Sequence, residues 1–212
     1  MGSAVNKSAY AITDHEALRR IYKAPGESAV KKDIGRIDAH VRHFLAKTPF
    51  AVIATSNAAG VQDASPKGGP PGFIVPLDER TLLIPDWPGN NRLDSLENIL
   101  VNPRVGILAF LPGVNEMLRM NGRAEITTDP DLRAQLSTGG KLPISVIVVT
   151  VEEVYLHCAR ALQRSALWDA SKQIDRKSFP TLGMILADQI AGYDGPGADQ
   201  RLAARAGDLY GA

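Results

Sequence analysis

Two segments in the middle of the chain carry residue types that bind phosphate groups. The first, SPKGGPPGF, places Ser65 and Lys67 beside a glycine-rich turn. The second, IPDWPGNNRLDSLENILVN, places four polar residues at the start of a helical pattern: Asn90, Asn91, Arg92 and Ser95. Backbone amides, side-chain amides, a hydroxyl and a guanidinium together bind phosphate, and the N-terminal amides of a helix attract anions. The two segments therefore predict a site for a phosphorylated cofactor.

Each of these segments also has a purely structural interpretation. Residues 68–71 are all turn formers, so SPKGG is equally consistent with a plain turn. Asn91 or Asp94 is a suitable cap for the helix that follows, which would leave Arg92 in solvent. The residues alone leave both interpretations open.

A third donor-rich segment is HCARALQRSALWD near residue 160. It contains His157, Cys158, Arg160, Arg164, Ser165 and Trp168. Arg160 and Arg164 are four residues apart, so a helix would place them on one face, where they suit a phosphate or carboxylate. Two arginines and an indole fit one end of a flavin site. The alternative is that Trp168 fills the core while the arginines face solvent.

Several catalytic schemes find no support in the sequence. The four histidines are scattered, without the spacing of a zinc site, and we expect no metal. His157 and Cys158 are adjacent, and neighbouring residues on a strand point to opposite faces, which excludes a thiol–imidazole pair there. The GxSxG, Walker and GxGxxG motifs are also missing.

Charge and cysteine content narrow the possible partners and the compartment. The 212 residues include 24 Lys+Arg and 23 Asp+Glu, so the net charge of +1 predicts no general binding to nucleic acid or to anionic membranes. Cys158 is the single cysteine, which suits a reducing compartment. The N-terminal residues lack the apolar run of a signal peptide, and no stretch is long enough to span a bilayer. We therefore expect a cytoplasmic protein.

The hydrophobic pattern predicts helices first and a mainly β region after them. Thr13 or Asp14 is a suitable cap for the helix HEALRRIY. IDAHVRHFLAKT is expected to form a second amphipathic helix, with Ile37, Val41, Phe44 and Leu45 on one face. From Pro49 onward, short runs rich in β-branched residues are separated by Gly, Pro, Asn and Asp, and residues 78–80 form the turn of a hairpin. About six such strands indicate a barrel.

Further helices are expected between these strands and after them. In RLDSLENILVNP, the apolar residues Leu93, Leu96, Ile99 and Leu100 have helical spacing, and Pro103 ends the helix. DPDLRAQLS, ARALQRSALWDAS and SFPTLGMILADQIAGY are also expected to be helical. The tail GADQRLAARAGDLYGA carries only a weak helical pattern.

The order of these segments resembles the pyridoxamine 5′-phosphate oxidase-like family of FMN-binding split barrels, in particular its branch of uncharacterised flavoproteins. The resemblance covers residues 33–188, and its most specific phrases are NPRVG and NGRAEI. It implies a mainly β fold with peripheral helices, built on a six-stranded antiparallel split barrel with Greek-key connections. The implied domains are an N-terminal helical extension (residues 1–32), the FMN-binding barrel (33–190) and a C-terminal tail (191–212).

The resemblance also implies a homodimer with FMN in two interface clefts and a small-molecule substrate. The implied FMN contacts are Ser65, Pro66 and Lys67 at the flavin ring, Ile84 and Asp86 along its edge, and Asn91, Arg92 and Ser95 at the phosphate. Many relatives carry Lys where this chain has Ser95, and we expect Arg160 or Arg164 to supply the missing charge. Ser165 and Trp168 would complete that end of the site.

The leading functional hypothesis is an FMN-dependent oxidoreductase, with Lys67 and Arg119 as candidates to stabilise negative charge on the reduced flavin. No catalytic acid or base is assigned. The chain ends in DLYGA and lacks the basic C-terminal motif of vitamin B6 oxidases, which argues against that substrate. The alternative is a non-catalytic protein that binds or senses FMN, haem or a deazaflavin, with His157 as the candidate haem ligand.

Overall fold

The computed structural model describes residues 10–210, and these residues divide into two compact units after Asp33. The first unit contains α1 (His15–Ile21) and α2 (Glu27–Lys31). Of the two predicted cap residues, Asp14 is the one that caps α1, because its side chain accepts a hydrogen bond of 2.7 Å from the amide of Ala17. Among the described residues of this unit none is fully buried, so the two helices have no hydrophobic core of their own.

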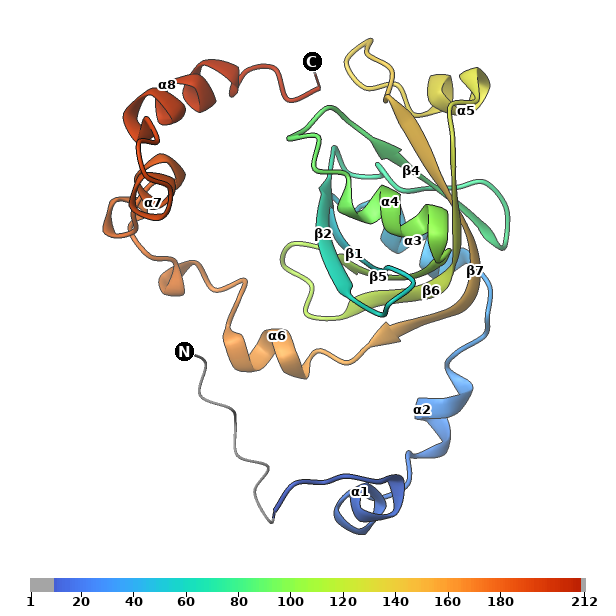
Figure 1. Cartoon of the computed structure of the whole chain (residues 1–212). Helices are drawn as coiled ribbons and strands as arrows, with labels where there is room; N and C mark the ends of the chain where they lie inside the picture. Colours follow the sequence, from blue (N-terminus) through green and yellow to red (C-terminus); the bar gives the residue numbers. More distant parts are fainter. Residues whose placement is uncertain (1–9, 211–212) are drawn as a thin grey trace. The chain divides into compact units, whose positions relative to one another are not determined.

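The second unit is built on one antiparallel sheet of seven strands (Figure 1). The strands are β1 (Phe50–Ser56), β2 (Gln62–Gly68), β3 (Val75–Pro76), β4 (Thr81–Asp86), β5 (Arg104–Phe110), β6 (Met117–Thr127) and β7 (Ser145–His157). Their order is β2-β1-β5-β6-β7-β4-β3, so β2 and β3 are edge strands and the sheet is not closed. The predicted mainly β fold with helices is confirmed, whereas the count of six strands was wrong by one.

The strand order places strands that are distant in sequence side by side. The order β5-β6-β7-β4 is that of a Greek key, with α4 in the long connection between β4 and β5. The β6–β7 ladder contains a bulge between Asn121 and Gly122. Only glycine fits there, because a Cβ on Gly122 would lie 2.1 Å from the carbonyl oxygen of Thr150. The bulge thus permits the long pair of strands to bend.

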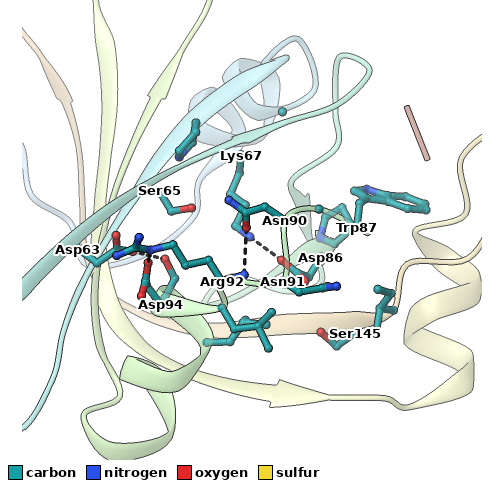
Figure 2. Close-up of a pocket in the computed structure, with 18 residues that line it drawn as sticks. Asp63, Ser65, Lys67, Asp86, Trp87, Asn90, Asn91, Arg92, Asp94 and Ser145 are labelled. Atoms are coloured by element: carbon teal, nitrogen blue, oxygen red, sulfur yellow. Dashed lines mark hydrogen bonds and ion pairs between the residues drawn. The ribbon is translucent and has the colours of Figure 1, made fainter. Parts of the chain in front are cut away.

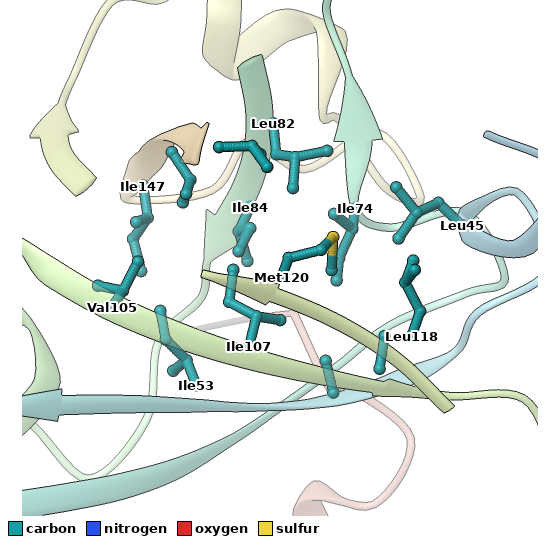
Figure 3. Close-up of a cluster of buried hydrophobic side chains, with 14 of the residues drawn as sticks. Leu45, Ile53, Ile74, Leu82, Ile84, Val105, Ile107, Leu118, Met120 and Ile147 are labelled. Carbon is teal, nitrogen blue, oxygen red and sulfur yellow. The ribbon is translucent and has the colours of Figure 1, made fainter. Parts of the chain in front are cut away.

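Alternating side chains from the strands form the core of the second unit (Figure 3). In β5, for example, Val105, Ile107 and Ala109 are buried while the residues between them are not. In β4, Leu82, Leu83 and Ile84 are all buried, because Leu83 packs on a second small cluster with Leu136 and Val146. This strand is therefore covered on both faces.

Two helices pack beside the sheet. Asp38 caps α3 (Ala39–Leu45), which buries Val41, Phe44 and Leu45 as predicted. In α4 (Asp94–Val101) the predicted apolar face is partly wrong, since Leu93 is 47% and Leu100 is 75% exposed. Leu93 precedes the helix, and the inward face instead combines buried Ser95 and Ile99 with polar residues that bond to β1. Asn98 donates to the Thr55 hydroxyl at 3.0 Å and Asn102 to the Ser56 hydroxyl at 2.9 Å.

The remaining α-helices follow β6 in the chain. They are α5 (Pro130–Gln135), α6 (Arg160–Ser165), α7 (Leu182–Gln189) and α8 (Gly195–Arg205). Helices α7 and α8 pack through two glycines, and a Cβ on Gly183 would lie 2.2 Å from the carbonyl oxygen of Gly195. None of the helices within residues 10–210 is long and apolar enough to cross a membrane.

Candidate functional site

The open side of the sheet contains a cavity of about 640 Å3, within the range of ligand-binding pockets (Figure 2). Its walls come from β2, the end of β4, the turn that follows β4, the start of α4 and the start of β7. Most of the residues predicted to bind a phosphorylated cofactor lie here. They are Ser65, Pro66, Lys67, Asp86, Asn90, Asn91, Arg92 and Ser95.

Every second residue of strand β2 faces the cavity and forms one of its walls. Asp63, Ser65 and Lys67 are each two residues apart, so they share one face of the strand, and all three are half-buried at the cavity. Pro66 is compatible with β2 because this is an edge strand, where a missing N–H is tolerated. The SPKGG segment is thus a strand that leads into a turn.

An ion pair connects the two sides of the open sheet. Lys67 of β2 donates to Asp86 of β4 at 2.5 Å, and their side chains are only 18% and 12% exposed. These two strands are not neighbours in the sheet order, so this bond joins them where no backbone ladder does. Asp86 is also opposite Ser145 in the β4–β7 ladder, which brings the start of β7 to the cavity. The pair fixes the position of a cation in the middle of the site.

Residues 93–96, at and just before the start of α4, line the cavity. The residue before the helix, Leu93, has a left-handed backbone (φ 58°), and no side chain among the described residues caps the helix. Neither Asn91 nor Asp94 is therefore the cap that the structural interpretation of the sequence required. The hydroxyl of buried Ser95 donates to Asp63 at 2.5 Å, which ties the helix to β2. An uncapped helix start of this kind favours an anion.

Arg92 lies at the rim of the cavity and already has a carboxylate partner. Its Nε donates to Asp94, and 76% of its side chain is exposed. The hydrogen bond to Asp94, with the charges of Asp94 and Asp63, raises the pKa of Arg92 above its usual value. The lining thus contains three carboxylates (Asp63, Asp86 and Asp94) and two cations (Lys67 and Arg92). A phosphate here must compete with carboxylates for both cations.

The structure does not bring every predicted site residue to this cavity. Ile84 is 1% exposed and belongs to the hydrophobic core, because its side chain points inward from β4. Arg160, Arg164 and Ser165 lie on α6, are exposed and do not line the cavity. Trp168 is half-buried, and its Nε1 donates to the carbonyl oxygen of Val114 at 2.9 Å. Within the described chain, packing accounts for this indole.

The sequence match that identifies the family covers the whole of this sheet. Residues 37–158, more than half of the chain, match the pyridoxamine 5′-phosphate oxidase family profile. The chain belongs to the pyridoxamine 5′-phosphate oxidase-like family. No curated protein matches the chain.

Several solved structures are similar to this family member. HupZ from Group A Streptococcus is 19% identical with a TM-score of 0.47, over 57% of this chain and 93% of that one. A putative pyridoxamine 5′-phosphate oxidase from Lactobacillus delbrueckii is 22% identical with a TM-score of 0.46, over 58% and 98% of the two chains. HutZ, the heme storage protein from Vibrio cholerae, is 17% identical with a TM-score of 0.41, over 57% and 94%.

Sequence reasoning missed several residues that line the cavity of this family member. Asp63 could have been found, because it continues the two-residue alternation of Ser65 and Lys67. Trp87 lies in the quoted segment IPDWPGNN, but nothing in its spacing assigns it a role. Ile144 and Ser145 reach the cavity only because β7 pairs with β4, and no local signal indicates this.

Proposed function

We propose that this chain binds FMN in the cavity between β2 and α4 and acts as an FMN-dependent oxidoreductase on a small molecule. The observation that supports this best is the convergence of Lys67, Arg92 and the uncapped start of α4 on one cavity of cofactor size. Arg92, Ser95 and the α4 amides would hold the phosphate, and Lys67 would contact the flavin. When bound, a flavin supplies hydride-transfer chemistry.

Carboxylates at the cavity compete with the FMN phosphate for two of its proposed partners, Arg92 and Ser95. To contact a phosphate, Arg92 must share or exchange the bond it makes with Asp94. Ser95 must likewise redirect a hydroxyl that now donates to Asp63. The helix amides have no such competitor among the described side chains, because none of these caps α4. The amides and Arg92 together are therefore expected to determine phosphate affinity.

A homodimer is part of this proposal, and the outer face of the sheet supports it. Val52, Leu108 and Phe110 are apolar and only half-buried there, and Phe50 is 41% exposed with its ring 5.9 Å from that of Phe110. The outer face of an antiparallel sheet is usually polar when water covers it. We infer that a second copy of the chain covers this face.

Helix α6 borders the same outer face, since Ala161 lines an apolar groove with Val52 and Leu108. Arg160, Arg164, Ser165 and Trp168 are not in the cavity of their own chain. If they bind FMN, they do so from a second copy. Sedimentation of the purified protein at micromolar concentration is expected to show a dimer, and a monomer that retains its cofactor would contradict an interface site.

Haem binding is a second candidate, favoured by the composition of the outer-face groove. Met117 and His157 are directly opposite in the β6–β7 ladder, and both line this groove of about 410 Å3 together with Arg119. Imidazole and thioether groups are axial ligands of haem iron. In this alternative the protein stores or senses a cofactor and does not turn over a substrate.

The cofactor released from purified protein decides between these candidates. Denaturation followed by mass spectrometry is expected to give the mass of FMN, with two broad absorption bands before release. A Soret band that His157→Ala abolishes would favour haem, and a deazaflavin would be recognised by its mass. Steady oxidation of a reduced nicotinamide cofactor in the presence of an electron acceptor would establish an enzyme. If the FMN-loaded protein shows no such turnover, a binding role would be favoured.

A further inference from the structure

The C-terminal end of the described chain is attached to the wall of the cavity at two points. Lys141 donates to both carboxylate oxygens of Asp208, at 2.6 and 2.7 Å. The ring of Tyr210 meets that of Trp87 edge to face, with centroids 4.8 Å apart and planes at 68°. Trp87 itself lines the cavity, beyond the Lys67–Asp86 pair (Figure 2). We call residues 208–210 the C-terminal latch.

The two attachment points belong to the two elements that form this end of the cavity. Trp87 directly follows β4, and Lys141 lies just before Ile144 and Ser145, which line the cavity at the start of β7. The amide of Ile144 donates to the carbonyl oxygen of Asp86 at 2.9 Å, so the two elements are already joined by a backbone bond. The latch therefore contacts two elements of the wall that a backbone hydrogen bond holds together.

The two contacts also differ in their physical nature. The side chains of Lys141 and Asp208 are 44% and 58% exposed, so salt screens their attraction. The contact between the rings of Trp87 and Tyr210 is apolar and does not depend on ionic strength in the same way. Raising the salt concentration should thus loosen one attachment and leave the other.

We propose that the C-terminal latch holds Trp87 in place as the wall for the planar ring of the bound ligand, which makes Tyr210 a positioning residue. The ligand class, a planar heteroaromatic ring, rests on the proposed flavin function. The holding of Trp87 by Tyr210 does not rest on it. The segment between Trp168 and Asp208, which contains α7 and α8, then connects the sheet to the C-terminal latch at the cavity.

The first test measures the apoprotein without any flavin. The chain has two tryptophans, so Trp168→Phe leaves Trp87 as the single tryptophan, and acrylamide quenching of tryptophan fluorescence reports how accessible it is. Tyr210→Ala is expected to increase the unlatched fraction roughly two- to tenfold, the range of one aromatic pair. Tyr210→Phe is the matched control and should leave the quenching unchanged. Asp208→Asn should increase the quenching of Trp87 less than Tyr210→Ala does. High salt should increase quenching in the parent chain as much as Asp208→Asn does.

If Trp168→Phe impairs folding, hydrogen exchange in the full chain replaces the fluorescence. Amides of residues 85–90 should exchange faster in Tyr210→Ala than in Tyr210→Phe. Equal quenching or equal exchange in these two variants would overturn the latch.

The second test measures FMN affinity in the same variants. Tyr210→Ala is expected to weaken FMN binding several-fold while Tyr210→Phe retains it, with the melting temperature of the apoprotein unchanged in both. If Trp87 becomes accessible but FMN affinity is equal in both variants, the positioning role is wrong. If no variant, nor the parent, binds FMN while the quenching changes as expected, the latch holds and the proposed function fails.

Discussion

Two segments of this chain contain a similar density of polar and aromatic residues, and the structure uses them differently. In the first segment, residues from 63–68 and 85–96 come together around one cavity, where Lys67 meets Asp86 and Ser95 meets Asp63. Residues 157–168 disperse, with exposed arginines on α6 and Trp168 bonded to Val114. The difference shows that local density of donors does not make a site. Contacts between distant strands do.

The largest expected effect tests whether Trp168 is a packing residue. Trp168→Ala should destabilise the apoprotein by about 2–4 kcal/mol, since it removes a half-buried indole together with its hydrogen bond to Val114. Because Trp168 does not line the cavity of its own chain, the FMN affinity of the folded fraction should not change. Chemical denaturation and flavin titration measure the two quantities. A stable variant with lost flavin would place Trp168 in the site, supplied by a second copy.

The ion pair across the open sheet gives the next largest effect. Lys67→Met should cost about 1–3 kcal/mol of stability, because it leaves the buried carboxylate of Asp86 without its cation. The double variant Lys67→Met/Asp86→Leu should recover most of that loss and still lack FMN binding. Urea unfolding with m-values checks the stability. FMN binding at parental affinity in the double variant would remove Lys67 from the site.

Asp94 competes with phosphate for Arg92 at the rim of the cavity, so substitutions of these two residues should change FMN affinity in opposite directions. Arg92→Ala should weaken FMN binding by roughly tenfold, the scale of one charge-assisted hydrogen bond. Asp94→Asn should strengthen it by a few-fold, because the guanidinium loses its competing partner. Isothermal titration at low salt measures both. If the two substitutions shift the dissociation constant in the same direction, Asp94 is not a competitor.

The smallest effect distinguishes the arginines of α6 from the cavity residues. Arg164 is exposed, so Arg164→Ala should change apoprotein stability by no more than about 0.5 kcal/mol. In a monomeric preparation it should leave FMN affinity as it is. Loss of affinity only at concentrations that give dimers would show that α6 acts on the site of a second copy.

Local sequence signals predicted most of the fold correctly. Asp14 caps its helix, and residues 78–80 turn between β3 and β4. The strand count was one too low because residues 62–76 form two strands, β2 and β3, with a Gly- and Pro-rich turn between them. The apolar face of α4 was misjudged because Leu93 lies outside the helix and Asn98 and Asn102 bond to β1. Such polar contacts are determined by the neighbouring strand.

The sequence by itself determined which side chains are available for chemistry. Ser65 and Lys67 were recognised as donors beside a glycine-rich turn, and the position of Arg92 before a helix follows from periodicity. Only the tertiary structure decided what these residues meet. The order of the sheet brings β2 opposite β4, pairs Asp86 with Lys67, and carries Ser145 and Trp87 to the same cavity. The physical reason is that strand pairing joins residues far apart in the chain, whereas spacing along the sequence reports only on the element that contains it.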